Sequence, residues 1–350
     1  MRAITTIVAA GAIALALGAG AEAAKSHKID LTGPLVIAKQ GSFFVGGRNI
    51  HSDTIAYKSL YSTSGTITVD QIYVHYQVPA HAERAPNVVL IHGCCLTGKT
   101  WETTPDGRMG WDEYFLRQGY PTYVIDQSWR GRSASDPSDL NAVHRGAEPI
   151  DKLPATMGSS QELAWVNFRM GPKQGEQYPG NQYPAEAIDE FYKQLVPDYS
   201  VALPQPNPTV PNLSLLSQKI GKAVLISHSQ SGIYPFQTEA LSTKGIAAIV
   251  SIEPGNCPDP KGPTAPYKDI PTLVVYGDYV QLSDSWRPRL ADCRAFADKL
   301  NAAGGHIKVI VLPEIGIHGN DHMMMQDKNS LQVADVIIDW IRKNALKAAA

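Results

Sequence analysis

The chain has 350 residues, of which 43% are hydrophobic and 18% are charged. This composition fits neither a disordered chain nor a membrane bundle, and the length suits one large domain or two smaller ones. The formal net charge is −2, from 31 basic and 33 acidic residues without a long run of either sign, so we expect no nucleic acid or anionic membrane as partner. A small substrate without strong charge is expected instead.

The first residues contain one arginine, an apolar stretch rich in alanine, and the small-x-small sequence Ala21-Glu22-Ala23. This pattern is typical of a secretory signal peptide. We therefore predict a signal peptide at 1–23 and a mature domain at 24–350 that is secreted or periplasmic. The alternative is an uncleaved anchor, but the apolar stretch is short for a spanning helix, so no stable membrane insertion is expected.

Short apolar runs recur along the chain, separated by segments long enough for helices. The first, residues 65–79, alternates polar and apolar residues like a half-buried strand. Six others are continuously apolar, as in strands that are buried on both faces. Together they predict an α/β fold with a doubly wound, mostly parallel central sheet flanked by helices. The six runs are 87–93, 121–127, 222–229, 246–255, 271–278 and 307–314.

The rhythm of strands and helices is interrupted between about residues 146 and 217. This block is rich in proline and contains one clear amphipathic stretch, residues 185–196. Long irregular segments are uncommon unless they serve a site, so we interpret 146–217 as a cap inserted over the edge of the sheet. A ragged surface excursion is the alternative. The closing segment, 331–345, has apolar residues at helical spacing and basic residues in its last turn.

The sequence AVLISHSQSG places Ser229 directly after a predicted strand and before a possible helix. In α/β sheets, sites form beyond the C-terminal ends of the strands. A sharp strand–turn–helix turn exposes a nucleophilic serine and needs small neighbours two residues away on both sides. Ser227 and Ser231 meet that need although glycine is more usual, so Ser229 is the predicted nucleophile.

A serine hydroxyl needs a base to take its proton. The segment between the last strand and the closing helix has two candidates, His318 and His322. We favour His322 because it lies closer to the helix that would hold its imidazole. His228 belongs to the nucleophile turn and is expected to point away from the serine.

A third group must orient the histidine. The usual place is the loop after 271–278, where this chain has Val280 in place of the expected aspartate. One strand earlier, Glu253 stands at the end of a predicted strand. We predict Glu253 as the acid, with Asp278 and Asp284 as alternatives.

Acyl transfer also needs hydrogen-bond donors for the developing oxyanion. We expect them to be the backbone amides of Gln230 and Cys94. An exported protein can keep disulfides, and four cysteines allow three pairings. We favour a bridge between the adjacent Cys94 and Cys95, which requires a distorted peptide, and a second bridge between Cys257 and Cys293.

The segment of His318 and His322 also allows a different chemistry. Together with Asp321 and three methionines, Met323 to Met325, these histidines could bind a soft metal such as copper. Consecutive methionines point in different directions and more often pack in a core, so we predict no metal and no cofactor.

Several stretches taken together resemble a known group, the secreted bacterial α/β-hydrolase esterases typified by the Alcaligenes esterase family. The resemblance extends over nearly the whole mature chain. It implies a Ser-His-Glu triad formed by Ser229, His322 and Glu253, and paired adjacent cysteines by the oxyanion hole. Ser227 and Asp321 depart from what that family leads us to expect. The stretches are QGSFFVGG, HGCC, SHSQSG, SIEPG and GNDHMMMQD.

The sequence thus predicts a secreted serine esterase with an α/β-hydrolase fold, acting on a small-molecule ester. The same residues could cleave an amide or a polyester. A hydrolase relative that only binds ligands is a further alternative, although a complete triad argues against it.

Overall fold

The structure is a computed structural model that describes residues 31–82 and 85–345. The predicted signal peptide, 1–23, lies outside the described residues. The chain divides into two units, Met1–Gly33 and Pro34–Ala350, and the account below concerns the second. None of the helices in the described part has the length and apolar character needed to cross a membrane.

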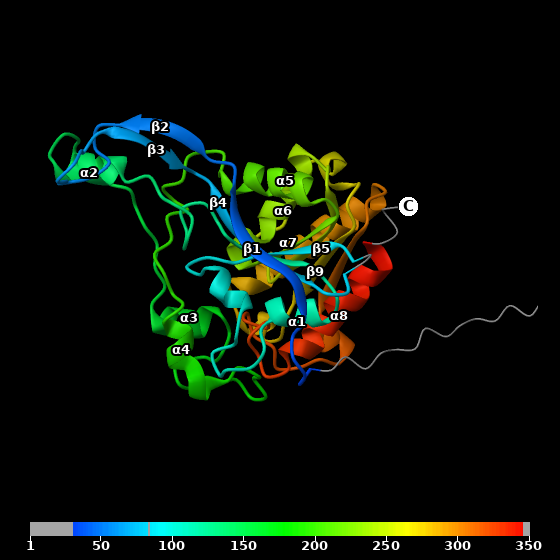
Figure 1. Ribbon diagram of the computed structural model, residues 1–350. Coiled ribbons are helices and arrows are strands. Elements are labelled where there is room, and N and C mark those ends of the chain that lie inside the picture. The colour runs from blue at the N-terminus through cyan, green and yellow to red at the C-terminus, as the bar shows by residue number, and fades with distance from the viewer. Residues whose placement is uncertain (1–30, 83–84, 346–350) are drawn as a thin grey trace, which may run out of the picture. The chain divides into compact units, whose positions relative to one another are not determined.

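Eight strands form the central sheet in the order β1-β4-β6-β5-β7-β8-β9-β10 (Figure 1). Six of them are parallel to their neighbours, which confirms the six apolar runs and the mostly parallel sheet. Two further strands, β1 (Ile37–Val45) and β4 (Ile72–Pro79), join antiparallel at one edge. The parallel strands are β5 (Asn87–Ile91), β6 (Thr122–Asp126), β7 (Ala223–His228), β8 (Ile246–Ile252), β9 (Thr272–Tyr276) and β10 (Ile307–Val311).

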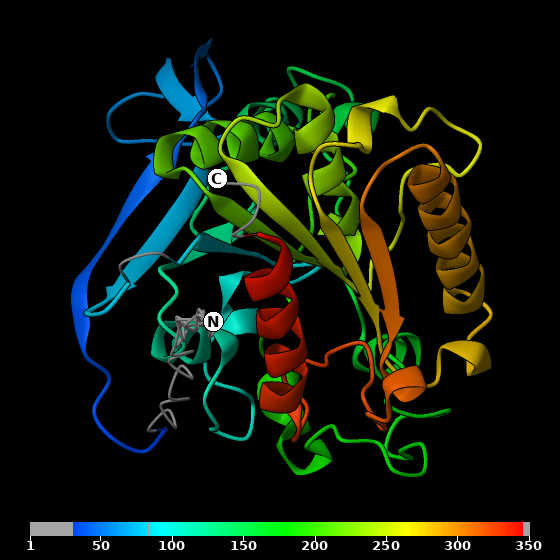
Figure 2. The ribbon, with the colours of Figure 1, turned by 90° about the vertical axis from the view of Figure 1, so that its right-hand side faces the viewer.

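Helices cover both faces of the sheet (Figure 2). Along β5, Val88 and Leu90 pack in one apolar cluster, and Val89 and Ile91 pack in another, because successive strand residues point to opposite faces. The first cluster includes residues of α1 (Trp111–Arg117) and α8 (Ser330–Asn344), and the second includes residues of α5 (Thr209–Ile220) and α6 (Tyr234–Leu241). A third cluster joins α7 (Trp286–Ala302) to β9 and β10.

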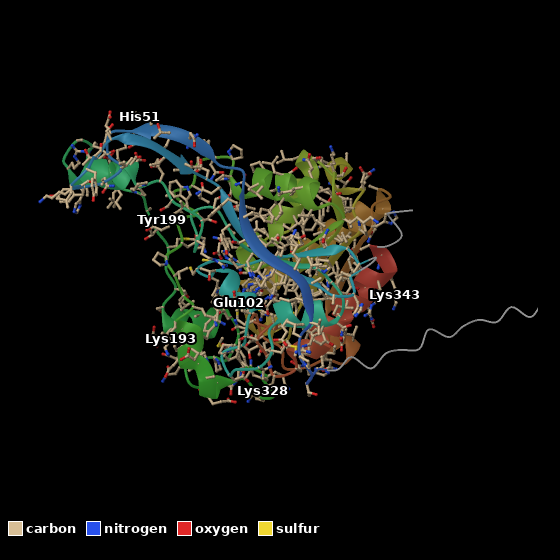
Figure 3. All side chains as sticks on the ribbon, viewed as in Figure 1. His51, Glu102, Lys193, Tyr199, Lys328 and Lys343 are labelled. Carbon is tan, nitrogen blue, oxygen red and sulfur yellow. A yellow bond between two sulfur atoms is a disulfide. The ribbon has the colours of Figure 1, made fainter. Side chains whose placement is uncertain are left out.

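The run 65–79 is two strands, so the prediction of one strand there was wrong. Asp70 has a φ of 70°, which breaks the extended backbone. β3 (Gly65–Val69) before it pairs with β2 (Arg48–Ser52) in a separate two-stranded sheet, and β4 after it enters the main sheet. This hairpin carries His51 and lies beside α2 (Ser138–His144), apart from the main sheet (Figures 1 and 3).

The proline-rich block before α5, from about residue 146 to 208, is called the insertion below. It contains α3 (Gln161–Asn167) and α4 (Ile188–Tyr192). The amphipathic stretch 185–196 forms only a short 3₁₀ turn followed by α4. The expected boundary at about 217 falls inside α5, which packs on the sheet. The start of α5 was missed because prolines at 208 and 211 suggest a loop. Proline is, however, tolerated at the start of a helix, where these two lie. The 3₁₀ helices are Gly98–Trp101, Ile150–Lys152, Ala185–Ala187, Ser229–Ile233, Ala265–Tyr267, Val280–Leu282 and Leu312–Ile315.

Candidate active site

Ser229 lies at the sharp turn between β7 and the 3₁₀ helix Ser229–Ile233. Its φ is 59°, a left-handed conformation that costs a non-glycine residue about 1 kcal/mol or more. The turn is tightly enclosed: a Cβ added at Gly93 would lie 2.8 Å from the Ser229 Cβ, and one at Gly232 would lie 2.5 Å from the Pro254 Cβ. The serine thus has the strained backbone and the small neighbours of a nucleophile turn.

Glu253 occupies the matching place on the next strand. β7 and β8 pair Ser227 with Ser251 and His228 with Ile252, so Ser229 and Glu253 are the next residues along the two strands. Glu253 is also left-handed, with a φ of 48°. Two strand ends side by side therefore carry the predicted nucleophile and the predicted acid.

The Glu253 carboxylate is fully buried and has partners on both oxygens. Oε1 accepts hydrogen bonds from the Gly277 amide at 2.5 Å and from Nη2 of Arg169 at 2.6 Å. Oε2 lies 3.3 Å from Nδ1 of His322. The carboxylate thus connects the insertion, the loop after β9 and the predicted base.

His322 is held by the insertion as well as by Glu253. Its amide donates to the Phe168 carbonyl at 2.9 Å, and its buried ring lies between the rings of Phe168 and Trp286, with centroid distances of 4.9 and 4.3 Å. The Nε2 atom makes no hydrogen bond to any residue that the structure describes. One ring nitrogen therefore contacts the Glu253 carboxylate, and the other has no protein partner among the described residues.

The surroundings of Glu253 and His322 favour an ionised carboxylate and a neutral imidazole. Burial raises the pKa of Glu253, but the Arg169 charge and the His322 hydrogen bond outweigh it, so the pKa lies below its usual value. Burial lowers the pKa of His322, the Glu253 carboxylate partly offsets this, and Arg169 adds to the lowering. The carboxyl group is thus held ionised and the imidazole neutral.

The alternative base and acids lie elsewhere. The side chain of His318 is 68% exposed, and its Nδ1 is 3.8 Å from Oδ2 of Asp278. That same oxygen accepts the Gly319 amide. Asp284 is 96% exposed and pairs with Arg287. The structure thus brings His322 and Glu253 together and leaves His318, Asp278 and Asp284 outside the buried cluster.

Two residues of this cluster had no role in the prediction from sequence. His228 places Nε2 2.9 Å from the His322 carbonyl oxygen, and the two rings are 4.5 Å apart. Burial and the neighbouring His322 hold the pKa of His228 well below its usual value, so a neutral imidazole donates this bond. The second residue is Arg169. A lone arginine among the apolar residues of WVNFRMG is a signal of a paired buried charge that sequence reasoning could have used.

The amides of Gln230 and Cys94 flank the nucleophile turn. Among the described residues, neither amide donates a hydrogen bond. The Gln230 side chain donates to Asp198 at 3.2 Å, and the Cys95 amide donates to the same carboxylate at 3.1 Å. Asp198 also forms a buried ion pair with Arg130. Asp198, in the proline-rich block, thus connects the two predicted donor segments.

The cysteines differ in state. Cys257 and Cys293 form a disulfide, as predicted, with α-carbons 5.2 Å apart. The expected Cys94–Cys95 bridge is not formed in this structure, where both residues are free thiols with Sγ atoms 2.7 Å apart, beyond the roughly 2.05 Å of a disulfide. Adjacent residues can be bridged only through a distorted peptide, which accounts for the difference.

One group within the described residues has the donor types of a metal site. Ligand atoms of Cys94, Cys95 and Asp198 lie within 4.8 Å of one another. The Asp198 carboxylate, however, is already neutralised by Arg130. The methionines of the copper alternative are fully buried in the apolar cluster below α8, so they serve as core. The methionines are Met323, Met324 and Met325.

Comparison with known proteins gives two close similarities. The chain is similar to a novel bacterial esterase of known structure, with 57% identity and a TM-score of 0.87 over 89% of this chain and 98% of that one. It is also 30% identical over 329 residues to a fungal protein named as a probable secreted lipase, spanning 78% of this chain and 86% of the relative. No family model matches the chain.

Proposed function

The chain belongs to an esterase family of the α/β-hydrolase type and is a carboxylic-ester hydrolase, and from this premise we propose that it acts through an acyl-enzyme on Ser229. In the proposed triad, His322 is the base and Glu253 is the acid that orients it. The observation that carries this assignment is the buried contact between His322 Nδ1 and Glu253 Oε2 at the strand end next to Ser229.

The reaction has two halves. Ser229 Oγ attacks the ester carbonyl while His322 Nε2 takes the hydroxyl proton and passes it to the departing alcohol. Water then attacks the acyl-enzyme, gives a proton to His322, and releases the acid with the serine restored. In each half the ionised Glu253 stabilises the imidazolium, which explains why a buried carboxylate must remain charged.

The oxyanion of each tetrahedral intermediate is assigned to the amides of Gln230 and Cys94. Donors that are already in place stabilise charge without reorganisation at the moment of reaction. The Asp198 contacts to both segments support this role, because they hold the two amides in a common frame. This machinery contains no step that calls for a metal or an organic cofactor.

The substrate is proposed to be a small, uncharged ester, and the protein is proposed to be exported after cleavage near residue 23. The fungal relative, a probable secreted lipase, supports export.

The test of the nucleophile uses a short p-nitrophenyl ester and a fluorophosphonate that labels active serines. We expect turnover, loss of turnover after labelling, and a single adduct on the peptide of Ser229. Ser229→Ala should remove both activity and label, whereas Ser62→Ala, at an exposed serine of the hairpin loop, should change neither. Esterase activity that persists in Ser229→Ala would refute the assignment.

The same triad could also cleave an amide or a polyester, and a p-nitroanilide of the same acyl group tests the first. A protein that only binds ligands would show neither turnover nor adduct. We place ester hydrolysis first because both relatives are named for that activity.

A further inference from the structure

The insertion reaches into the triad at two consecutive residues. The Phe168 carbonyl accepts the His322 amide at 2.9 Å, and Arg169 donates to Oε1 of Glu253 at 2.6 Å. Arg169 also donates from Nε to the Asp278 carbonyl at 3.1 Å. These two residues therefore contact the base, the acid and the loop where an acid is usually found.

Arg169 is built into this place. Its side chain is 1% exposed, its guanidinium lies 5.3 Å from the Trp286 ring centroid, and its φ of 63° is left-handed. A non-glycine residue in that conformation persists only where its surroundings determine it. A buried arginine, moreover, is costly unless it is paired, and its carboxylate partner here is Glu253.

We propose that Arg169 is a positioning residue for ester hydrolysis, which fixes the Glu253 carboxylate against His322 from the insertion. Because the acid is on the strand before the usual one, its carboxylate is held by Arg169 and by the loop after β9. Here that loop contributes only backbone atoms, the Gly277 amide to Glu253 and the Asp278 carbonyl to Arg169. The proposal rests on the triad proposed above.

The cation also sets the pH range of the pair. A positive charge beside Glu253 and His322 opposes protonation of both groups, so the ionised acid and the neutral base persist to lower pH. Removing that charge should raise the proton affinity of the pair and move the acidic limb of kcat/KM to higher pH. Other titratable or charged groups facing the pair are His228, Tyr276, Arg289, Asp321 and Asp327.

The test compares pH profiles of kcat and KM for the wild type, Arg169→Gln and Arg169→Lys. For Arg169→Gln we expect a kcat about a hundredfold lower, a KM within about threefold, and an acidic limb about one pH unit higher. Arg169→Lys keeps the charge but lacks the planar guanidinium that binds Glu253 and Asp278 through separate nitrogens, so kcat should fall only about tenfold with the limb near its wild-type position.

Arg48→Gln is the control, because it breaks an arginine–carboxylate pair, with Asp70, outside the Glu253–His322 contact and outside the proposed oxyanion hole. It should leave the acidic limb in place. A folded Arg169→Gln whose limb coincides with that of the wild type would overturn the proposal, as would a limb that moves equally in Arg48→Gln. If Arg169→Gln does not fold, Arg169→Lys decides: an unchanged kcat would overturn the proposal.

Fluorophosphonate labelling separates this inference from the triad assignment. If Ser229 is not the nucleophile, the wild type is not labelled there and the proposed function fails first. If Ser229 is labelled in the wild type and the pH profile of Arg169→Gln is unchanged, only the role of Arg169 fails.

Discussion

His228 Nε2 lies 2.9 Å from the backbone carbonyl oxygen of His322. The residue before the proposed nucleophile therefore anchors the main chain of the proposed base, across 94 positions of sequence. Both rings are buried, and their centroids are 4.5 Å apart. The turn of Ser229 and the loop of His322 thus contact each other through a hydrogen bond and through ring packing.

This contact predicts the effect of His228→Phe, which keeps a ring but removes the donor. The His322 carbonyl would be left buried without its partner, at a cost of about 1–3 kcal/mol in unfolding free energy. A displaced base should also lower kcat about ten- to hundredfold. Urea unfolding and steady-state kinetics measure the two effects. His144→Phe, at an exposed histidine of α2, should change neither, and a wild-type kcat in His228→Phe would contradict the anchoring role.

The base can be identified by comparing the two histidines of one loop. His322→Ala should lower kcat about 10⁴-fold or more, because triad members act as a unit. His318→Ala should stay within about twofold of the wild type, since its side chain is 68% exposed and faces Asp278. The measurement is kcat/KM on a p-nitrophenyl ester per mole of protein, with the folded state of each variant checked by circular dichroism. The reverse pattern would make His318 the base.

The acid can be identified in the same way. Glu253→Gln keeps the shape of the side chain but removes the charge that stabilises the imidazolium, so kcat should fall about 10²- to 10⁴-fold. Asp278→Asn alters the carboxylate nearest the usual acid position and should cost only a few-fold. A larger loss in Asp278→Asn than in Glu253→Gln would reverse the assignment.

The raised pKa of Asp327 predicts that the free energy of unfolding depends on pH. Burial raises its pKa to about 7, although hydrogen bonds from Asn320 and the Asp321 amide act in the opposite direction. The folded carboxyl group stays protonated up to about pH 7, whereas an unfolded aspartate ionises near pH 4, so stability falls as the pH rises between these values. Asp327→Asn removes this loss.

The melting temperature of Asp327→Asn relative to wild type should therefore rise from pH 4 to pH 8. The comparison uses the difference between the two proteins at each pH, so that the titration of groups far from Asp327 cancels. Asp284→Asn, at an exposed carboxylate, is the control and should give a difference that does not vary with pH. A flat difference for Asp327→Asn would show that the carboxyl group titrates normally.

The Cys257–Cys293 disulfide should contribute to stability through the unfolded chain. It closes a loop with a sequence separation of 36, for which the chain-entropy relation gives about 4 kcal/mol. We expect the double variant Cys257→Ser/Cys293→Ser to lose stability of this order in urea unfolding. Cys257→Ser alone should lose a similar amount, because one missing sulfur already opens the loop. A loss below about 1 kcal/mol would mean that the bridge does not constrain the unfolded state.

Sequence patterns were sufficient for the parallel part of the sheet because its strands are buried on both faces and read as unbroken apolar runs. β1 was missed, since it lies at an edge and has mostly exposed or half-buried residues. The break at Asp70 was missed as well, because its cause is a backbone conformation held by distant partners, Arg48 and Trp129.

Local patterns also led to Ser229, His322 and Glu253, because each follows a recognisable strand or precedes the closing helix. Arg169 and His228 were not assigned roles, since their partners lie 84 and 94 residues away and no periodic pattern links them. Their contacts become visible only when the insertion and the base loop are folded against the strand ends.

The left-handed backbone at position 229 lowers the stability of the fold, whereas the serine there is needed for the proposed reaction. Glycine adopts that conformation without the steric cost that a residue with a Cβ bears, so Ser229→Gly should be more stable than both the wild type and Ser229→Ala. A library selected for heat resistance alone would therefore tend to lose the proposed nucleophile. Engineering this enzyme for durability requires that catalysis be scored in every round.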